Sequence, residues 1–139
     1  MKHKQIKDTY FIRLDRGEKI IETLKNFCNK NKIKCGYFFG IGALNEVELA
    51  HYIVENKKYT SKTYKQPLEI VNMTGNITTM NNEIYLHCHI VLSDEKMHAI
   101  AGHIKEGTIA ATCEIILVKL NANINRKHDD FIGLNLLDI

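Results

Sequence analysis

The sequence has a single proline and no tract rich in serine or glycine among its 139 residues. These absences argue against flexible linkers and low-complexity segments. No stretch approaches the ~20 apolar residues that a membrane-spanning helix needs, and the basic N-terminal residues lack the apolar run of a signal peptide. We therefore expect one globular domain over residues 1–139, located in the cytoplasm and without a membrane partner.

Disulfide and zinc-finger patterns are also missing. None of the four cysteines forms a Cys-X-X-Cys pair, and each lies among apolar neighbours. Such cysteines are typically free thiols that pack as small hydrophobic side chains, as expected in the cytoplasm. The positions are Cys28, Cys35, Cys88 and Cys113.

A compact basic cluster is absent as well. The net charge is only +3, and the lysines are dispersed and partly offset by glutamates. This distribution is as compatible with an ordinary solvated surface as with nucleic-acid contact.

Nucleotide-binding and nucleophile motifs are not found. The segment Gly40–Asn45 has two glycines of a GxGxxG loop, but Asn45 holds the third place and a strand pattern follows where a helix is required. We interpret it as a glycine bend between strands. The chain has neither a Walker A loop nor a GxSxG elbow.

One helix is predicted by the hydrophobic pattern. Apolar residues recur at helical spacing and leave polar residues on the opposite side. Asp15 and Glu18, three residues apart, resemble a capping box at its start. Asn31 suits a left-handed C-terminal end. The apolar stripe consists of Ile20, Ile21, Leu24, Phe27 and Cys28.

Alternating hydrophobicity elsewhere predicts strands joined mostly by short hairpins, with turns at 56–58, 80–83, 93–96 and 105–107. The expected fold class is α+β, with one main helix packed on a mainly antiparallel sheet of about seven strands. The tail from Arg126 to Ile139 mixes charged and apolar residues. We expect it to pack on the body of the domain or on a neighbouring subunit.

The strongest chemical signal lies between Glu83 and His103, which holds four of the seven histidines. His87 and His89 have the same strand parity, so they lie on one face about 7 Å apart at Cα. Cys88 has the opposite parity and is not expected to share their ligand. A hairpin at 93–96 would bring His103 alongside them.

Two imidazoles at this spacing can share an ion with Zn–N distances of about 2.0–2.1 Å. The alternative is a polar sheet face with ordinary hydrogen-bonded histidines. Imidazole suits zinc, copper, nickel and iron, and three histidines leave an open coordination position, as in catalytic zinc sites. We therefore predict a divalent transition metal, zinc first, at His87, His89 and His103.

Two carboxylates lie among apolar residues of predicted strands, Glu69 and Glu114. A carboxylate in such surroundings is costly unless it is paired. Both are therefore candidates for a general base or for a group that supports the metal ligands. The alternative is that strand alternation places them on a solvated face.

Several motifs together resemble the plant-and-prokaryote conserved (PPC) domain. Their shared order and spacing, over nearly the whole chain, make the resemblance specific. The motifs are Arg13–Glu18, Gly40–Leu44, Leu68–Asn76, His87–Ile90, Ala101–His103 and Cys113–Ile115, followed by Arg126, Asp129-Asp130 and Gly133-Leu134 in the tail.

This resemblance implies an α+β domain that assembles as a homotrimer. Prokaryotic members are commonly described as predicted DNA-binding proteins, and some carry a metal on the histidine motif; by position the ligands would be His87, His89 and His103. Where the family often has Gly-Gly-His, this chain has Ala101-Gly102-His103. It also lacks the Arg-Gly-Arg-Pro hook whose arginines enter the minor groove in plant members.

The sequence thus predicts a metal-binding, homotrimeric PPC-domain protein with a DNA-binding or regulatory role. Because the lysines are dispersed, DNA binding by the isolated domain is expected to be weak and sensitive to salt. Two alternatives stay open: a metal-dependent enzyme acting on a small molecule, with Glu69 or Glu114 as base, and a trimeric scaffold for other proteins.

Overall fold

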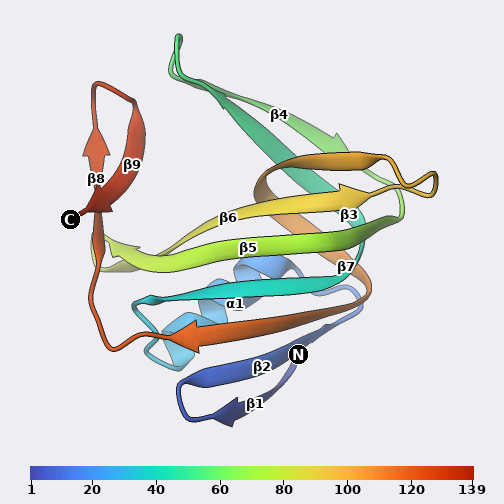
Figure 1. Cartoon of the computed structure of the whole chain (residues 1–139), viewed down its shortest axis with the longest axis horizontal. Coiled ribbons are helices and arrows are strands. Elements are labelled where there is room, and N and C mark those ends of the chain that lie inside the picture. Colours follow the sequence, from blue (N-terminus) through green and yellow to red (C-terminus); the bar gives the residue numbers. More distant parts are fainter.

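One helix and nine strands make up the fold in a computed structural model that describes all 139 residues (Figure 1). The α+β class and the single helix on a mostly antiparallel sheet are confirmed, with two more strands than expected. The bounds are β1 Lys2–Ile6, β2 Thr9–Asp15, α1 Ile20–Lys30, β3 Gly36–Ile53, β4 Lys58–Tyr64, β5 Leu68–Met80, β6 Glu83–Ser93, β7 Ala99–Lys119, β8 Asn125–Asp129 and β9 Leu134–Asp138.

The sheet closes on itself at the centre of the molecule. β3 pairs with β5 and β7, and β6 pairs with both β5 and β7, so these four strands form a ring. β2 and β1 extend the sheet from β7, and β4 extends it from β3. The buried apolar residues form one core inside this arrangement.

Two long strands make the ring possible because they bend at bulges. The β3–β7 register shifts near Gly42 and again between Glu48 and Leu49. An extra residue on one strand bends it and increases its twist. A Cβ atom at Gly42 would lie 2.3 Å from the carbonyl oxygen of Thr112, so glycine is needed where the strands approach. The predicted glycine bend is therefore a bulge inside one continuous strand.

The turn predicted at 105–107 was wrong, because β7 continues through these residues. Glu106 pairs with Glu48 and Ile104 with Leu49, which leaves Lys105 as the extra residue of a bulge. Gly107 is buried, and a Cβ atom there would lie 3.3 Å from the Leu44 side chain. This glycine makes room for core packing and does not reverse the chain.

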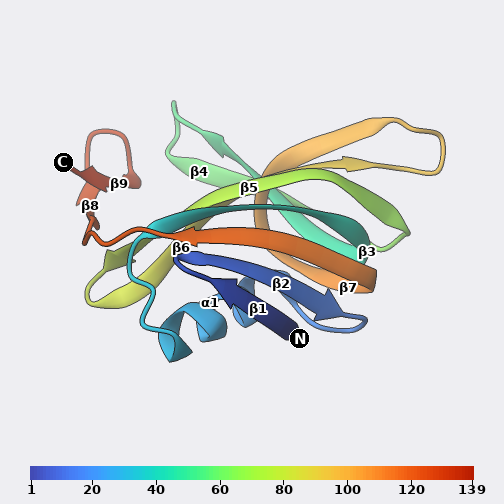
Figure 2. The same ribbon diagram turned by 60° about the horizontal axis from the view of Figure 1, so that its bottom comes forward.

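Helix α1 covers the inner face of the sheet with the predicted apolar stripe, and Figure 2 shows it beneath the strands. Its N-terminus is capped from β7. The carboxylate of Glu106 accepts hydrogen bonds from the backbone N–H groups of Ile21 and Glu22, at 2.9 and 3.1 Å. Asp15 and Glu18, which were predicted to cap the helix, instead close the turn before it: the backbone N–H of Asp15 donates to the Glu18 carboxylate at 2.7 Å.

The helix ends where predicted, but a different residue takes the left-handed conformation. Asn31 follows the last helical residue with φ −95°, and Lys32 has φ 52°. Asn31 instead donates from its side-chain amide to the carbonyl of Phe27 at 2.9 Å. This eleven-residue helix is neither long nor apolar enough to cross a membrane.

The tail packs on the body as the β8–β9 hairpin, at one end of the sheet (Figures 1 and 2). A single pairing, Thr79 with Asn125, joins it to β5. The Tyr52 hydroxyl also donates to the carbonyl of Ile132 at 2.6 Å, and Lys57 donates to the carbonyl of Asp130 at 2.7 Å. These contacts connect the hairpin to the β3–β4 end of the domain.

Candidate metal centre

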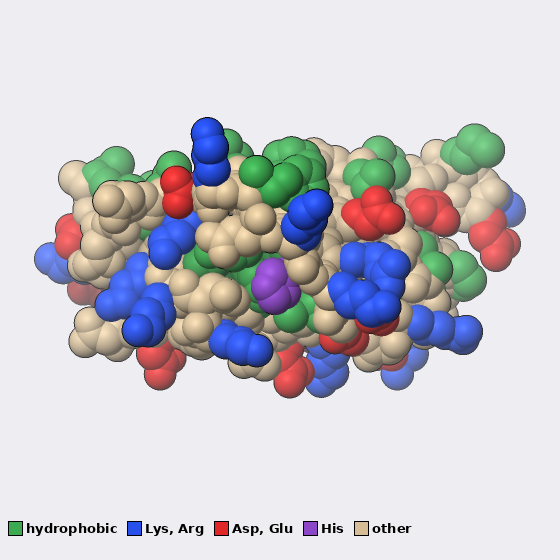
Figure 3. Space-filling view, turned by 90° about the horizontal axis from the view of Figure 1, so that it is seen from below, with side chains coloured by type: hydrophobic (Ala, Val, Ile, Leu, Met, Phe, Trp, Pro, Cys, Tyr) green, Lys and Arg blue, Asp and Glu red, His purple; other side chains and the backbone are tan.

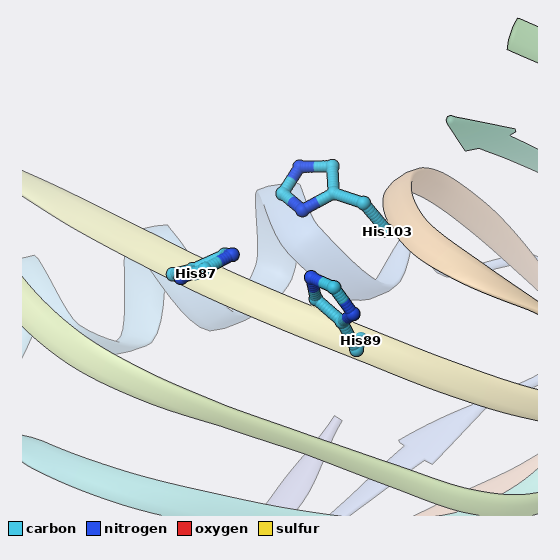
Figure 4. A group of neighbouring side chains, drawn as sticks. All are labelled: His87, His89 and His103. Atoms are coloured by element: carbon cyan, nitrogen blue, oxygen red, sulfur yellow. The ribbon is translucent and has the colours of Figure 1, made fainter. Parts of the chain in front are cut away.

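Strand β6 presents two histidines away from the core. Cys88 and Ile90 are buried, whereas His87 is half-buried and His89 is exposed. The alternation predicted from the sequence thus separates the histidines from the apolar residues of the same strand. In Figure 4 the imidazoles project from one side of β6 and helix α1 lies behind it.

A tight hairpin returns the third histidine. His103 of β7 is directly opposite His89 of β6, as the turn signal at 93–96 predicted. The turn is held by Asp94, whose carboxylate accepts hydrogen bonds from the backbone N–H groups of Lys96 and His98, both at 2.9 Å. A short, fixed connection sets the register, and the register places His103 beside the pair.

The three imidazoles converge (Figure 4). The ring centroids of His87, His89 and His103 are 5.1 to 5.5 Å apart, and one nitrogen of each ring lies within 4.8 Å of the others. Nitrogens bound to one zinc ion at about 2.0–2.1 Å are separated by about 4 Å or less. A modest rotation of the rings would close this difference, so the donor set fits a transition-metal ion.

The electrostatics also suit metal binding. Burial lowers the pKa of His103 to about 4, and the neighbouring positive charges of His87, His89 and Lys105 act in the same direction. Burial lowers the pKa of His87 as well, followed by the charges of Arg126 and His89. Both imidazoles are therefore neutral near pH 7, which is the form that binds a metal.

Cys88 and His98, which belong to the same histidine-rich segment from Glu83 to His103, lie outside the cluster of the three imidazoles. Cys88 is buried, as expected from its parity, and burial raises the pKa of its thiol to about 12. His98 is exposed and contacts the Asp94 carboxylate at 3.2 Å. All four cysteines are buried free thiols, as predicted.

The two predicted carboxylates are not among the converging side chains. Glu69 is exposed on β5 opposite Ser93. Glu114 is exposed on β7 opposite Arg13 and Ile41. Both are exposed, so neither is a buried carboxylate in need of a partner, and their roles as base or support for the metal ligands stay predictions.

Other residues near the histidines were not assigned to the site from the sequence. The Tyr59 ring lies 5.9 Å from the ring of His103. Asn76 is the β5 residue directly opposite His87, and its carboxamide accepts a hydrogen bond from Arg126. The guanidinium carbon of Arg126 lies 4.9 Å from the centre of the Tyr85 ring. No local pattern links these residues to the histidines, because strand pairing alone brings them together.

The family model described as the Plants and Prokaryotes Conserved (PCC) domain matches residues 1–121. Solved structures share the fold over almost the whole chain. A candidate DNA-binding protein from Bacteroides thetaiotaomicron is 32% identical, with a TM-score of 0.96, and the match covers 99% of this chain and 96% of that one. No curated protein matches.

Two further solved structures are also similar. A metal-containing protein from Archaeoglobus fulgidus is 25% identical, with a TM-score of 0.88, and the match covers 95% of this chain and 94% of that one. A plant- and prokaryote-conserved (PPC) protein from Pyrococcus horikoshii is 27% identical, with a TM-score of 0.87, and the match covers 99% and 94% of the two chains.

Proposed function

The chain belongs to the Plants and Prokaryotes Conserved (PCC) domain family, and from this premise we propose that it is a metal-binding domain that assembles as a homotrimer and has a DNA-binding or regulatory role. The convergence of His87, His89 and His103 carries the proposal. A relative of the same fold is a metal-containing protein. Zinc is the first candidate ion, because three neutral imidazoles are a common ligand set for it.

The protein's own residues explain how such an ion would be held. The strand register fixes the three imidazoles on the outer face, and burial keeps at least His87 and His103 neutral. A bound ion with three protein ligands retains an open position that can polarise or bind a further group. Because the core lies on the other face, loss of the ion is not expected to unfold the domain.

The metal content of untagged protein tests this proposal. We expect about one ion per chain after loading with zinc and dialysis, and a loss of binding in the double variant His87→Ala, His89→Ala. His98→Ala is the matched control, since His98 is an exposed histidine of the same hairpin outside the cluster. Unchanged metal stoichiometry in the double variant would place the binding site elsewhere.

The homotrimer is supported by an apolar row on the outer face. Phe11, Ile116 and Phe39 are directly opposed across β2, β7 and β3, and the same row continues through Thr74 to His89. Phe11 and Phe39 are about half exposed. With Tyr37 and Ile41 they define the outer apolar patch. Monomeric proteins rarely leave such a surface uncovered.

We propose that a second copy of the chain covers the outer apolar patch, in a closed ring of three. The patch surrounds a cleft of about 580 Å³ whose lining includes Arg13 and Glu114, residues of opposite charge. Arg13 is already paired with Asp15 of the same chain at 3.0 Å, so the apolar contact is what supports this proposal.

Sedimentation velocity at micromolar concentration tests the assembly. We expect a trimer for the native protein and dissociation for Phe39→Glu, because a charge in the apolar contact is costly. Phe131→Glu is the control, since Phe131 is highly exposed in the β8–β9 loop outside the patch. A monomeric native protein, or a trimeric Phe39→Glu variant, contradicts this assignment.

The DNA-binding role is drawn from the relatives, two of which are candidate DNA-binding proteins. Figure 3, which views the molecule from below, shows lysine and arginine side chains in separate groups with acidic side chains among them. Affinity for DNA depends on the number of phosphates that basic residues neutralise. We therefore expect weak binding that is lost near physiological salt. Nanomolar, sequence-selective binding in an anisotropy titration at that salt would contradict this expectation.

A further inference from the structure

Arg126 is a buried cation without a counter-ion. The residue is 9% exposed, and its three hydrogen bonds go to neutral acceptors: the Thr78 hydroxyl at 2.9 Å, the Asn76 carboxamide at 2.8 Å and the Asn135 carbonyl at 2.7 Å. No carboxylate lies within ion-pair distance of it, although amino and guanidinium groups elsewhere in the chain make six ion pairs with carboxylates. A buried charge without an opposite charge is costly.

The guanidinium lies near His87, one of the three histidines. It binds the Asn76 carboxamide, and Asn76 is directly opposite His87 on the neighbouring strand. Directly opposed residues share a face, with Cβ atoms about 4.5–5.5 Å apart. The positive charge of Arg126 accordingly contributes to the lowered pKa of His87.

The other cation near the site is already neutralised. Lys105, whose charge contributes to the lowered pKa of His103, donates a hydrogen bond to the Glu48 carboxylate at 2.8 Å. Arg126 is therefore the charge at this site that lacks a partner. Burial alone also lowers the pKa of its guanidinium, so the surroundings disfavour the charge that it carries.

A structural role accounts for only part of this arrangement. Arg126 donates three hydrogen bonds, one from each guanidinium nitrogen: two attach the β8–β9 hairpin to Thr78 and Asn76 of β5, and the third goes to Asn135 of β9 within the hairpin. A guanidinium has five N–H groups, so one remains on each terminal nitrogen. Two such donors suit the two oxygens of a carboxylate.

We propose that Arg126 binds the carboxylate of a small organic acid whose second oxygen-bearing group occupies the open coordination position of the metal at His87, His89 and His103. This inference rests on the metal site proposed above, and it assigns to that site a ligand class: dicarboxylates and 2-hydroxy or 2-oxo acids. The ligand supplies the negative charge that Arg126 lacks, and the metal supplies its second point of attachment.

Cobalt-loaded protein tests the inference, because the visible absorption of Co²⁺ reports changes in its coordination. We expect a saturable spectral change on titration with at least one of oxalate, malonate and succinate, which differ in the spacing of their two carboxylates. In Arg126→Gln the affinity should fall about 10-fold or more, the typical effect of losing a charge-assisted hydrogen bond. The matched control, Lys127→Gln, removes an exposed cation from the same strand and should bind as the native protein does.

A second variant guards against loss of the hairpin in Arg126→Gln. Asn76→Asp keeps the shape of the side chain and supplies a carboxylate to the guanidinium, so it should keep cobalt and weaken dicarboxylate binding by a similar factor. If the native protein binds no cobalt, the metal proposal fails. If it binds cobalt without a dicarboxylate response, or if Asn76→Asp and folded Arg126→Gln both respond as the native protein does, the inference fails and the metal site stands.

Discussion

The two faces of β6 differ in what they contribute to the protein. On the inner face Ile90 and Leu92 are almost fully buried in the core, whereas on the outer face His87 and His89 converge with His103. Alternate residues of one strand thus serve folding and ligand binding separately. Because the two sets of side chains point apart, each can be changed with little effect on the other.

The sharpest test of this comparison uses adjacent residues. Ile90→Ala should lower the unfolding free energy by about 2–5 kcal/mol, because it leaves a cavity in the core. His89→Ala should change it by about 0.5 kcal/mol or less in metal-free protein, since His89 is exposed. Urea denaturation measures both. Metal binding should show the opposite order, being lost in His89→Ala and retained in folded Ile90→Ala; a similar loss of stability in both variants would contradict the separation.

Substitution of Gly75, a glycine on the inner face, should have the next largest effect on stability. A Cβ atom at Gly75 would lie 2.5 Å from the Phe38 ring and 2.6 Å from the carbonyl oxygen of His87. Gly75→Ala should therefore destabilise the protein by about 1–3 kcal/mol through overpacking. Gly17→Ala is not a suitable control, because Gly17 has φ 86°. Thr74→Ala, on the outer face beside it, should cost less, and thermal unfolding compares the two.

The contact between the helix and the sheet should have a smaller effect. Glu106 accepts hydrogen bonds from two backbone N–H groups at the start of α1. Glu106→Ala should cost about 0.5–2 kcal/mol, as the loss of a helix cap does. Glu95→Ala is the control, because Glu95 is an exposed carboxylate in the β6–β7 turn. Equal urea midpoints for the two variants would show that the cap does not stabilise the fold.

The last expected effect is a pH dependence on the outer face, and it is confined to acidic pH. His103 has a pKa of about 4 in the folded protein, against an ordinary value of 6.5. Between these values the unfolded chain binds the extra proton, so the unfolding free energy rises with pH. In metal-free protein this contribution should be complete above about pH 6.5 and lost as the pH falls toward about 4. Urea midpoints across this window should fall less in His103→Ala than in native protein; parallel curves would contradict the assignment.

The sequence by itself determined the local features. The alternating pattern of β6 predicted that Cys88 faces away from His87 and His89, and the helical pattern predicted the apolar residues with which α1 packs on the sheet. The Asn81-Asn82 turn was predicted between two strands, and both residues adopt positive φ, as a two-residue hairpin loop requires. These features depend on neighbouring residues only. His103 could be added because a short hairpin is itself a local signal.

Only the tertiary structure decided the rest. In the structure β7 continues through Gly107, and Glu106 caps helix α1. Arg126 contacts Asn76, which is directly opposite His87. Each of these depends on a contact between residues roughly 50 or more positions apart. The bulged strands β3 and β7 close a ring with β5 and β6, and β8 joins β5 at Thr79; these long-range pairings bring the residues together. Periodicity reports which face a side chain occupies, and ring closure decides which other side chains share that face.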